Sequence, residues 1–449
     1  MSNGQTASEN SVGVLTPAHS YWRWNILLST YFAYSGFYLC RKVYSLAKPL
    51  IAAPVAEGGL GLDWNQIANI WSVFLIAYML GQFVTSFLGR KWAPKVLLVG
   101  GLGLSMLVNL VFGFANSYWT FLVFMIFNGF LQSTGWPSSV GAVAHWIRPQ
   151  ERGLIMGIWS TSHIVGTMVV KLVGGILLAY AGWRWSFWGA TLVAAPLWGI
   201  LIWRHHDKPE DVGLAPLVIP AQGNEADIQE EGGEHLSLAE YFRLALHPVV
   251  LMMGFSYLCV KFLRYALDSW LPTFLVVQMD VSASHASYYS MVYDICGILP
   301  AVLAGWALDK LFRGNWAMLC LVAAVGMILG FVIALTFDGS ALAVALSFGV
   351  VGFMIFGPET LLSGAASVQV AGEKNGLAVA GLVNGIGSIG PILQETVIGG
   401  LMKSNEATGM RNTNLLCLCL CIFFFGFMAM ATWLRHRAIA RKAAQSSAN

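Results

Sequence analysis

The sequence predicts an all-α polytopic membrane protein whose twelve transmembrane helices form two pseudosymmetric halves of six. Composition is the first of two observations behind this prediction. Of the 449 residues, 57% are hydrophobic and 10% are charged, whereas a soluble domain carries about 25% charged residues. The mean hydropathy is +0.66, and so little charge cannot cover a surface in water. Soluble enzymes, nucleic-acid-binding proteins and disordered scaffolds are therefore excluded. The second observation is an internal repeat, described below.

The apolar stretches set the number of spans, because a helix needs about 20 apolar residues to cross the hydrocarbon core. Six such stretches precede a polar segment and six follow it. The predicted spans are 24–48, 65–88, 96–116, 118–143, 154–180, 184–203, 248–278, 286–309, 316–337, 341–369, 376–401 and 412–434. The domains expected from them are a tail 1–23, a helical bundle 24–203, a linker 204–247, a second bundle 248–434 and a tail 435–449.

The distribution of basic residues predicts the orientation. With the N-terminus inside, most of the 25 Lys and Arg residues fall in cytoplasmic segments. The opposite side holds only Arg184, Lys403 and Arg411. Because short cytoplasmic loops carry the excess of basic residues, we expect both termini in the cytoplasm. The expected location is a plasma membrane of the bacterial inner-membrane type.

The two halves repeat each other at a nearly constant offset. Pro137 in Gly-Trp-Pro and Pro358 in Phe-Gly-Pro are 221 positions apart, and Arg41 and Arg264 are 223 apart. Parallel repeats of this kind build many transporters, which bind substrate near the midplane between the repeats. The repeat therefore places the two arginines at equivalent depths on the first helix of each half.

Charges at this depth need an explanation, because an intramembrane arginine costs several kcal/mol unless it faces a cavity or a partner. One interpretation is that the helices end at Arg41 and Arg264, which snorkel to the headgroups. Another makes them structural partners of Asp268 and Asp294. The interpretation that we favour is an anion site, because a guanidinium group offers a rigid fork of donors to phosphate oxygens.

Around these arginines the sequence resembles the organophosphate:phosphate antiporters of the major facilitator superfamily. The matching stretches are YLCRKVYSLAKP (38–49), GWP (135–137), ERG (151–153), GIWSTSHIVG (157–166), KFLRYALDSWLPTFL (261–275), AGWALDKLFRGN (304–315) and FGP (356–358). The resemblance covers nearly the whole chain and implies the major facilitator fold. The paired arginines and the histidine of the fifth span are the more specific features, whereas the Asp-Lys loop occurs throughout the superfamily.

The resemblance also implies roles for individual residues. Arg41 and Arg264 match the two arginines that bind phosphate, and His163 matches a binding-site histidine. Further matches are the aromatic cavity residues Tyr34, Tyr38, Trp136 and Trp159, the salt-bridge lysine Lys42 with Asp268 as its expected partner, the acidic residue Asp294, and the gating-loop residues Arg90, Asp309 and Lys310.

The sequence departs from the family in ways that bear on the substrate. Some family members carry a cavity lysine on the second helix, where this chain has Gln82. Lys261 instead stands where glycerol-phosphate transporters have an aromatic residue. One basic group has moved from the first half to the second, so the part of the substrate beyond the phosphate is expected to differ. Gly89 also replaces the usual aspartate of the gating loop.

We therefore expect a secondary transporter, not an enzyme, that exchanges a small phosphorylated anion for inorganic phosphate. Two alternatives remain open at this point: a proton- or sodium-coupled symporter of a carboxylate such as a sugar acid, and a transporter-like sugar-phosphate sensor. No pair of a nucleophile and a base supports catalysis. We expect no metal, no cofactor and no nucleic-acid partner, and we expect a monomer in the lipid bilayer.

Overall fold

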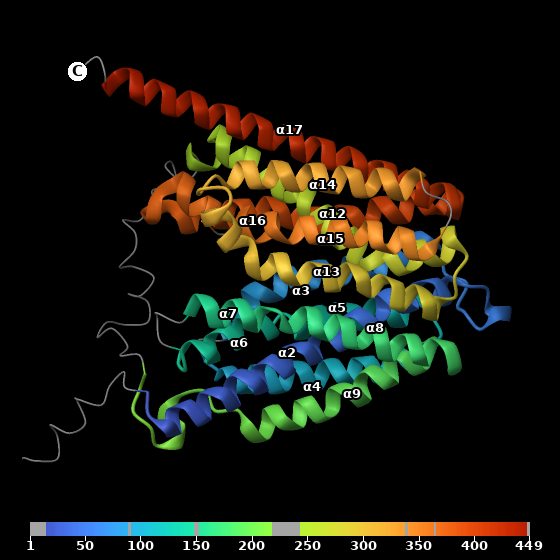
Figure 1. The fold of residues 1–449 in the computed structure, drawn as a ribbon. Helices are drawn as coiled ribbons and strands as arrows, with labels where there is room; N and C mark the ends of the chain where they lie inside the picture. Colours follow the sequence, from blue (N-terminus) through green and yellow to red (C-terminus); the bar gives the residue numbers. More distant parts are fainter. Residues whose placement is uncertain are drawn as a thin grey trace, which may run out of the picture. The chain divides into compact units, whose positions relative to one another are not determined.

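The structure is a computed structural model that describes residues 15–88, 91–147, 152–217, 243–336, 340–362 and 365–446. Every regular element in these ranges is a helix (Figure 1). Two of them are short 3-10 helices, η1 (Val55–Glu57) and η3 (Pro209–Val212). The predicted all-α class is therefore confirmed.

The chain divides into two compact units. The first contains Met1–Asn224 with Ser282–Tyr288, and the second contains Glu225–Val281 with Tyr289–Asn449. The helices before the division are α2 (Pro17–Ala52), α3 (Trp64–Leu88), α4 (Pro94–Gly113), α5 (Tyr118–Gln132), α6 (Gly135–Ala144), α7 (Arg152–Ser160), α8 (Ser162–Tyr180) and α9 (Trp183–Arg204). Those after it are α12 (Pro248–Met279), α13 (Ala283–Lys310), α14 (Trp316–Thr336), α15 (Ala341–Leu362), α16 (Ala365–Ser404) and α17 (Glu406–Ser446). The first residues of α13 belong to the first unit.

Length and hydropathy identify a multi-pass membrane protein. Seven helical segments among the described residues are long and apolar enough to cross a membrane. They are Pro94–Gly113, Ile155–Tyr180, Trp183–Arg204, Pro248–Met279, Trp316–Thr336, Ala341–Leu362 and Thr408–Leu434.

Some predicted span boundaries are wrong. The stretch 118–143 is divided between α5 and α6. The predicted span 154–180 agrees with the candidate span Ile155–Tyr180, within which the helix is interrupted at Thr161 between α7 and α8. Pro137 explains the first division, because it has no amide hydrogen for the carbonyl one turn earlier. The span predicted as 341–369 instead ends at Leu362, and α16 begins at Ala365.

Close helix packing fixes the face of α2 that carries Tyr34, Tyr38 and Arg41. A Cβ atom added at Gly166 of α8 would lie 2.5 Å from the Ser35 carbonyl oxygen. The Ser35 hydroxyl donates to the Ser162 carbonyl oxygen at 2.8 Å. Because glycine lets two backbones approach closely, α8 brings its first turn directly against α2.

Outside the spans, Asp207 joins the segment after α9 to the start of α4. Its Oδ1 accepts from the Lys95 amide at 2.8 Å and lies 3.3 Å from Nε2 of His205. Burial raises the pKa of this carboxyl, but the hydrogen bonds from His205 and from the Lys95 amide outweigh burial and leave the pKa below its usual value. The carboxylate form is therefore favoured in the folded protein, at the N-terminus of a helix where negative charge is stabilising.

We expect Asp207→Asn to destabilise the folded protein by about 0.5 kcal/mol at pH 7, because Asn still accepts from the Lys95 amide and only the negative charge at the N-terminus of α4 is lost. Since the folded-state pKa is lowered, this stabilisation is present above about pH 4 and is lost as the pH falls through the folded value. Thermal unfolding in detergent measures the loss. Glu210→Gln, at an exposed position three residues later, is the control. Equal unfolding midpoints for the two variants at pH 7 would contradict the capping role.

Candidate functional site

Arg41 is a buried cation in the middle of α2. Arg41 is 7% exposed. Its guanidinium carbon lies 4.7 Å from the ring centre of Tyr38 and 4.5 Å from that of Tyr78. Nε donates to Gln132 Oε1 at 3.0 Å. Nη2 is buried and has no hydrogen-bond partner among the described residues. The aromatic faces partly offset the cost of burying the charge, but one donor remains unsatisfied.

A neutral polar network holds Arg41 in place. Gln132, the last residue of α5, donates to the Phe37 carbonyl oxygen at 3.0 Å and to the Ser105 hydroxyl at 2.8 Å. Ser105 donates in turn to Asn128 Oδ1 at 2.6 Å. Because its amide group is fixed by two donated bonds, Gln132 presents its oxygen to Arg41 in one orientation. The network neutralises none of the positive charge.

Four predicted aromatic residues gather one to two turns before Arg41. Tyr34 has ring centres of Tyr38, Trp136 and Trp159 within 5.3 to 5.6 Å. The two tryptophans lie 5.6 Å apart, and Trp159 donates to the Thr30 hydroxyl at 3.0 Å. Tyr34 and Trp159 are buried, whereas Trp136 is partly exposed. The breaks between α5 and α6 and between α7 and α8 place these tryptophans at the ends of short helices.

His163 lies in the first turn of α8, with its ring 5.5 Å from that of Tyr38. Its Nδ1 is hydrogen-bonded to the Ser160 carbonyl oxygen. Because a carbonyl oxygen only accepts, Nδ1 carries the hydrogen, and in the neutral ring Nε2 is then the acceptor. His163 therefore belongs to the same group of side chains as Tyr38 and Arg41.

In the second unit, Arg264 of α12 forms an ion pair with Glu359 of α15. Nη1 donates to Glu359 Oε1, and the guanidinium carbon lies 5.1 Å from the ring centre of Phe356. The two charged side chains are 15% and 12% exposed. Glu359 is thus a carboxylate partner that the sequence interpretation, with Asp268 and Asp294 as the partners of the arginines, did not name.

Lys261 lies one helical turn before Arg264 and contacts α16. Its Nζ donates to Asn384 Oδ1 at 2.8 Å and to the Ser388 hydroxyl at 3.3 Å. The ammonium group also lies 4.9 Å from the ring centre of Tyr257. Both hydrogen-bond acceptors are neutral, as Gln132 is for Arg41. On neighbouring turns of α12 the second unit therefore presents two cations, of which Arg264 is paired with the carboxylate of Glu359 on α15.

The remaining predicted residues lie at the following places. Lys42 is buried on α2 with Nζ 5.6 Å from the ring centre of Trp71. Asp294 is buried on α13, and Asp268 is half-buried on α12. The expected pair of Lys42 and Asp268 joins the two units and stays a prediction. Arg90 and the side chain of Asp309 lie outside the described residues, and Lys310 is exposed at the end of α13.

Four residues around these cations were missed by sequence reasoning: Gln132, Tyr78, Asn384 and Glu359. Glu359 had a clear signal, because an ionisable residue inside a predicted span is a functional candidate by default. Gln132 and Asn384 are polar residues within predicted spans, which is a weaker signal. Tyr78 had none, because aromatic residues are frequent in apolar helices.

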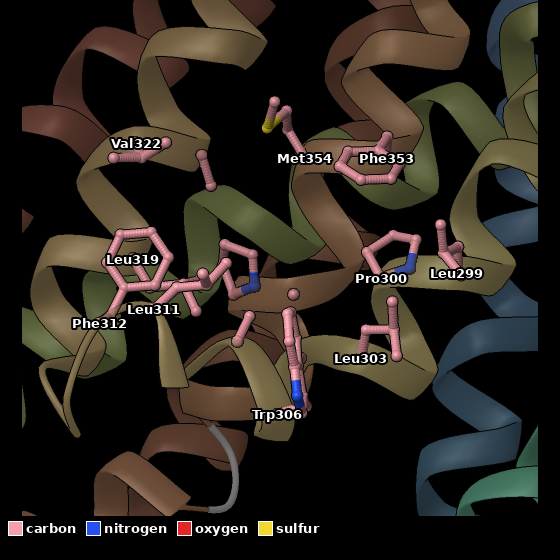
Figure 2. Close-up of a pocket in the computed structure, with 15 residues that line it drawn as sticks. Leu299, Pro300, Leu303, Trp306, Leu311, Phe312, Leu319, Val322, Phe353 and Met354 are labelled. Atoms are coloured by element: carbon pink, nitrogen blue, oxygen red, sulfur yellow. The ribbon is translucent and has the colours of Figure 1, made fainter. Parts of the chain in front are cut away.

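A separate apolar cavity of about 250 Å³ lies between α13, α14 and α15 (Figure 2). Its lining includes Pro300, Trp306, Leu319 and Phe353, and no charged side chain contributes to it. Because an anion in such a cavity would find neither countercharge nor sufficient donors, this cavity is not the phosphate site. In addition, no group of three or more His, Cys, Asp or Glu residues in the described part of the chain is arranged to hold a metal ion.

Comparison with known proteins decides the family. A family model described as the Major Facilitator Superfamily matches residues 30–395, which is most of the chain. The chain belongs to the major facilitator superfamily. Members of the superfamily are transporters, so the expectation that the chain is not an enzyme is confirmed by its family.

Individual relatives place the chain within the superfamily. The membrane sensor protein UhpC of Salmonella typhimurium is 30% identical over 366 residues, covering 80% of this chain and 81% of the relative. A probable hexose phosphate transport protein of Chlamydia muridarum is 29% identical, covering 79% and 80%. Sugar phosphate exchanger 3 of Mus musculus is 26% identical, covering 86% and 88%. These relatives confirm the expected branch of the superfamily, the organophosphate:phosphate antiporters.

A solved structure supports the fold. The inward-facing, unoccupied crystal structure of a bacterial homologue of the human lysosomal transporter Spinster has a TM-score of 0.71. The match covers 93% of this chain and 97% of that chain at 17% identity. At this identity the similarity concerns the fold alone, and it is consistent with the predicted major facilitator architecture.

Proposed function

We propose that this protein exchanges phosphorylated organic anions for inorganic phosphate across the membrane by alternating access. In this proposal Arg41 and Arg264 bind the phosphoryl group, and Lys261 binds a second acceptor on the substrate. Two relatives whose names refer to hexose phosphate or sugar phosphate support the substrate class. The expected topology has both termini in the cytoplasm, with the protein acting as a monomer.

The observation that carries the proposal is the buried guanidinium group of Arg41, whose Nη2 has no hydrogen-bond partner among the described residues. No carboxylate in the described part of its own unit pairs with Arg41, and Nη2 has no hydrogen-bond partner. An unpaired buried charge costs several kcal/mol. A protein keeps such a group where a ligand supplies the missing charge and acceptors. Phosphate suits this role, because its oxygens accept paired, charge-assisted hydrogen bonds from guanidinium donors.

The side chains around Arg41 suggest how the rest of the substrate is bound. Tyr38 and Tyr78 flank the guanidinium, and Trp136 offers a partly exposed aromatic edge nearby. Aromatic faces with polar tips suit the apolar and hydroxyl faces of a sugar or glycerol moiety. His163 adds an acceptor nitrogen in its neutral form. Lys261 places a further cation in the second unit, so a substrate with a second negative or hydroxyl group is favoured.

Exchange follows from the electrostatics of two like charges. Two arginines that approach the same point repel one another, and an anion between them converts this repulsion into attraction. Reorientation is then favoured only with a bound anion. Such a carrier moves one anion in each direction instead of accumulating a single substrate with a coupled ion.

Proteoliposomes test the proposal directly. Purified protein should take up labelled inorganic phosphate when the vesicles contain phosphate or a hexose phosphate, and uptake should fall to background in vesicles without an internal anion. Uptake that is driven by a proton or sodium gradient in phosphate-free vesicles would instead establish the symport alternative. A panel of glycerol phosphate, hexose phosphates, phosphoglycerates and sugar acids, competing against labelled phosphate, would then define the organic part of the substrate.

One observation favours a second function, because the 30% identical relative is a membrane sensor protein. A sensor would bind the sugar phosphate without moving it. Saturable binding to the purified protein without exchange in proteoliposomes would support this function and exclude transport.

A further inference from the structure

The two arginines have hydrogen-bond acceptors of different charge. Arg41 donates to the neutral amide oxygen of Gln132, whereas Arg264 donates to the carboxylate of Glu359. The N-terminal arginine therefore keeps its full positive charge, and the C-terminal arginine is already paired with an anion. Both members of this pair retain some exposed surface, with side chains that are 15% and 12% exposed.

Glu359 is held against Arg264 by the geometry of α15. Phe356 and Glu359 are three residues apart and lie on the same face of the helix, and both contact Arg264. The side of α15 away from these two residues carries Met354, Gly357 and Pro358, which line the apolar cavity in Figure 2. The ion pair with Arg264 directs the Glu359 carboxylate towards α12, away from the apolar side of α15.

We propose that Glu359 is an internal anion that competes with the substrate for Arg264 and so speeds substrate release. The proposal rests on the function proposed above, in which Arg264 binds the phosphoryl group. An incoming anion must either displace the Glu359 carboxylate from the guanidinium or bind beside it against the repulsion of a like charge. Either way the negative charge of Glu359 weakens anion binding.

Weaker binding is useful to an exchanger. Each transport cycle ends with release of the bound anion, and differences in affinity between related complexes lie mostly in the dissociation rate. A carboxylate that returns to Arg264 as the anion leaves replaces the lost interaction and lowers the barrier to release. Without this competitor the anion would bind more tightly but leave more slowly.

The alternative is that Glu359 only orients Arg264, and Glu359→Gln separates the two roles. Glutamine keeps the shape and one acceptor oxygen, as Gln132 does for Arg41, but removes the charge. Competition predicts that the Kd for inorganic phosphate falls about tenfold and that the maximal exchange rate also falls, by about threefold or more. A purely orienting role predicts an unchanged or higher Kd.

The experiment measures equilibrium binding of inorganic phosphate to purified protein in nanodiscs, together with the rate of phosphate exchange in proteoliposomes. Glu406→Gln, which removes one negative charge at the exposed start of α17, is the matched control and should change neither quantity. Glu359→Asp, which keeps the charge, should bind phosphate within about threefold of the wild type. If Glu359→Gln does not fold, Glu359→Ser removes the same charge and is expected to tighten binding as well.

The outcomes separate this proposal from the proposed function. A wild-type protein that neither binds nor exchanges phosphate would refute the function itself. A wild-type protein that binds phosphate, with neutral variants at position 359 that bind it equally or more weakly, would overturn only the competition by Glu359. Tighter binding with a faster maximal exchange rate would refute the role in release.

Discussion

Replacing Arg41 with lysine is expected to reduce phosphate exchange at least about 100-fold with little change in expression. Lysine keeps the positive charge but loses Nε, which donates to Gln132, and the planar group that lies between Tyr38 and Tyr78. An ammonium group offers a point charge where the site is built for a rigid fork of donors. A 100-fold loss corresponds to about 2.8 kcal/mol, which is within the range for truncating a buried charged hydrogen bond.

The control for this substitution is Arg184→Lys in the same unit. Arg184 donates to Asn116 Oδ1 at 2.8 Å at the start of α9, far along the chain from the anion site. The substitution Arg184→Lys should therefore leave the rate of phosphate exchange unchanged. The initial rate of labelled phosphate uptake, normalised to the amount of reconstituted protein, is the measurement. Near-normal uptake by Arg41→Lys would show that Arg41 does not bind the anion.

Arg264→Lys is expected to reduce exchange by a smaller factor, at least about 30-fold. The new ammonium group can still pair with Glu359, so the contact between α12 and α15 is preserved. That pair leaves fewer donors for a ligand than guanidinium does, because lysine has three donors and arginine five. The effect is smaller than at Arg41 because the charge of Arg264 is already partly compensated in the wild-type protein.

Arg437→Lys provides the matched control in the second unit. Arg437 lies over the ring of Trp433 at 3.7 Å near the end of α17, and the substitution should leave exchange unaffected. When binding is measured without transport, Arg41→Lys and Arg264→Lys should each have a higher Kd for phosphate than the wild-type protein. A normal Kd for Arg264→Lys would exclude a direct contact between Arg264 and the phosphoryl group.

Much of the architecture could be predicted from the order of residues alone. Apolar stretches of membrane-spanning length locate the helices, because a helix satisfies its backbone polar groups within one continuous segment of chain. The errors occur where local chemistry interrupts a long apolar stretch. At Ser133 and Thr134 the hydroxyl groups donate to the carbonyl oxygens of Phe130 and Leu131, and Pro137 follows within one turn. A hydropathy pattern does not predict such hydrogen bonds from side-chain hydroxyl groups to the backbone.

The identities of the site residues were predictable to a similar degree. Arg41, Arg264 and Lys261 stand out because charges are rare inside spans. Tyr34, Tyr38, Trp136, Trp159 and His163 were named from the family resemblance, and the structure brings them together around the same part of α2. Their function as a binding site remains a proposal that the exchange experiments test.

The sequence by itself determined the membrane class and the helical architecture, because both follow from hydropathy and spacing along the chain. Only the tertiary structure decided what each arginine contacts. Gln132 is 91 positions from Arg41, Glu359 is 95 from Arg264, and Asn384 is 123 from Lys261. Such pairs depend on which helices pack together and in which rotation. That choice is made by side-chain packing across the whole bundle, and it leaves one arginine fully charged and the other paired with a carboxylate.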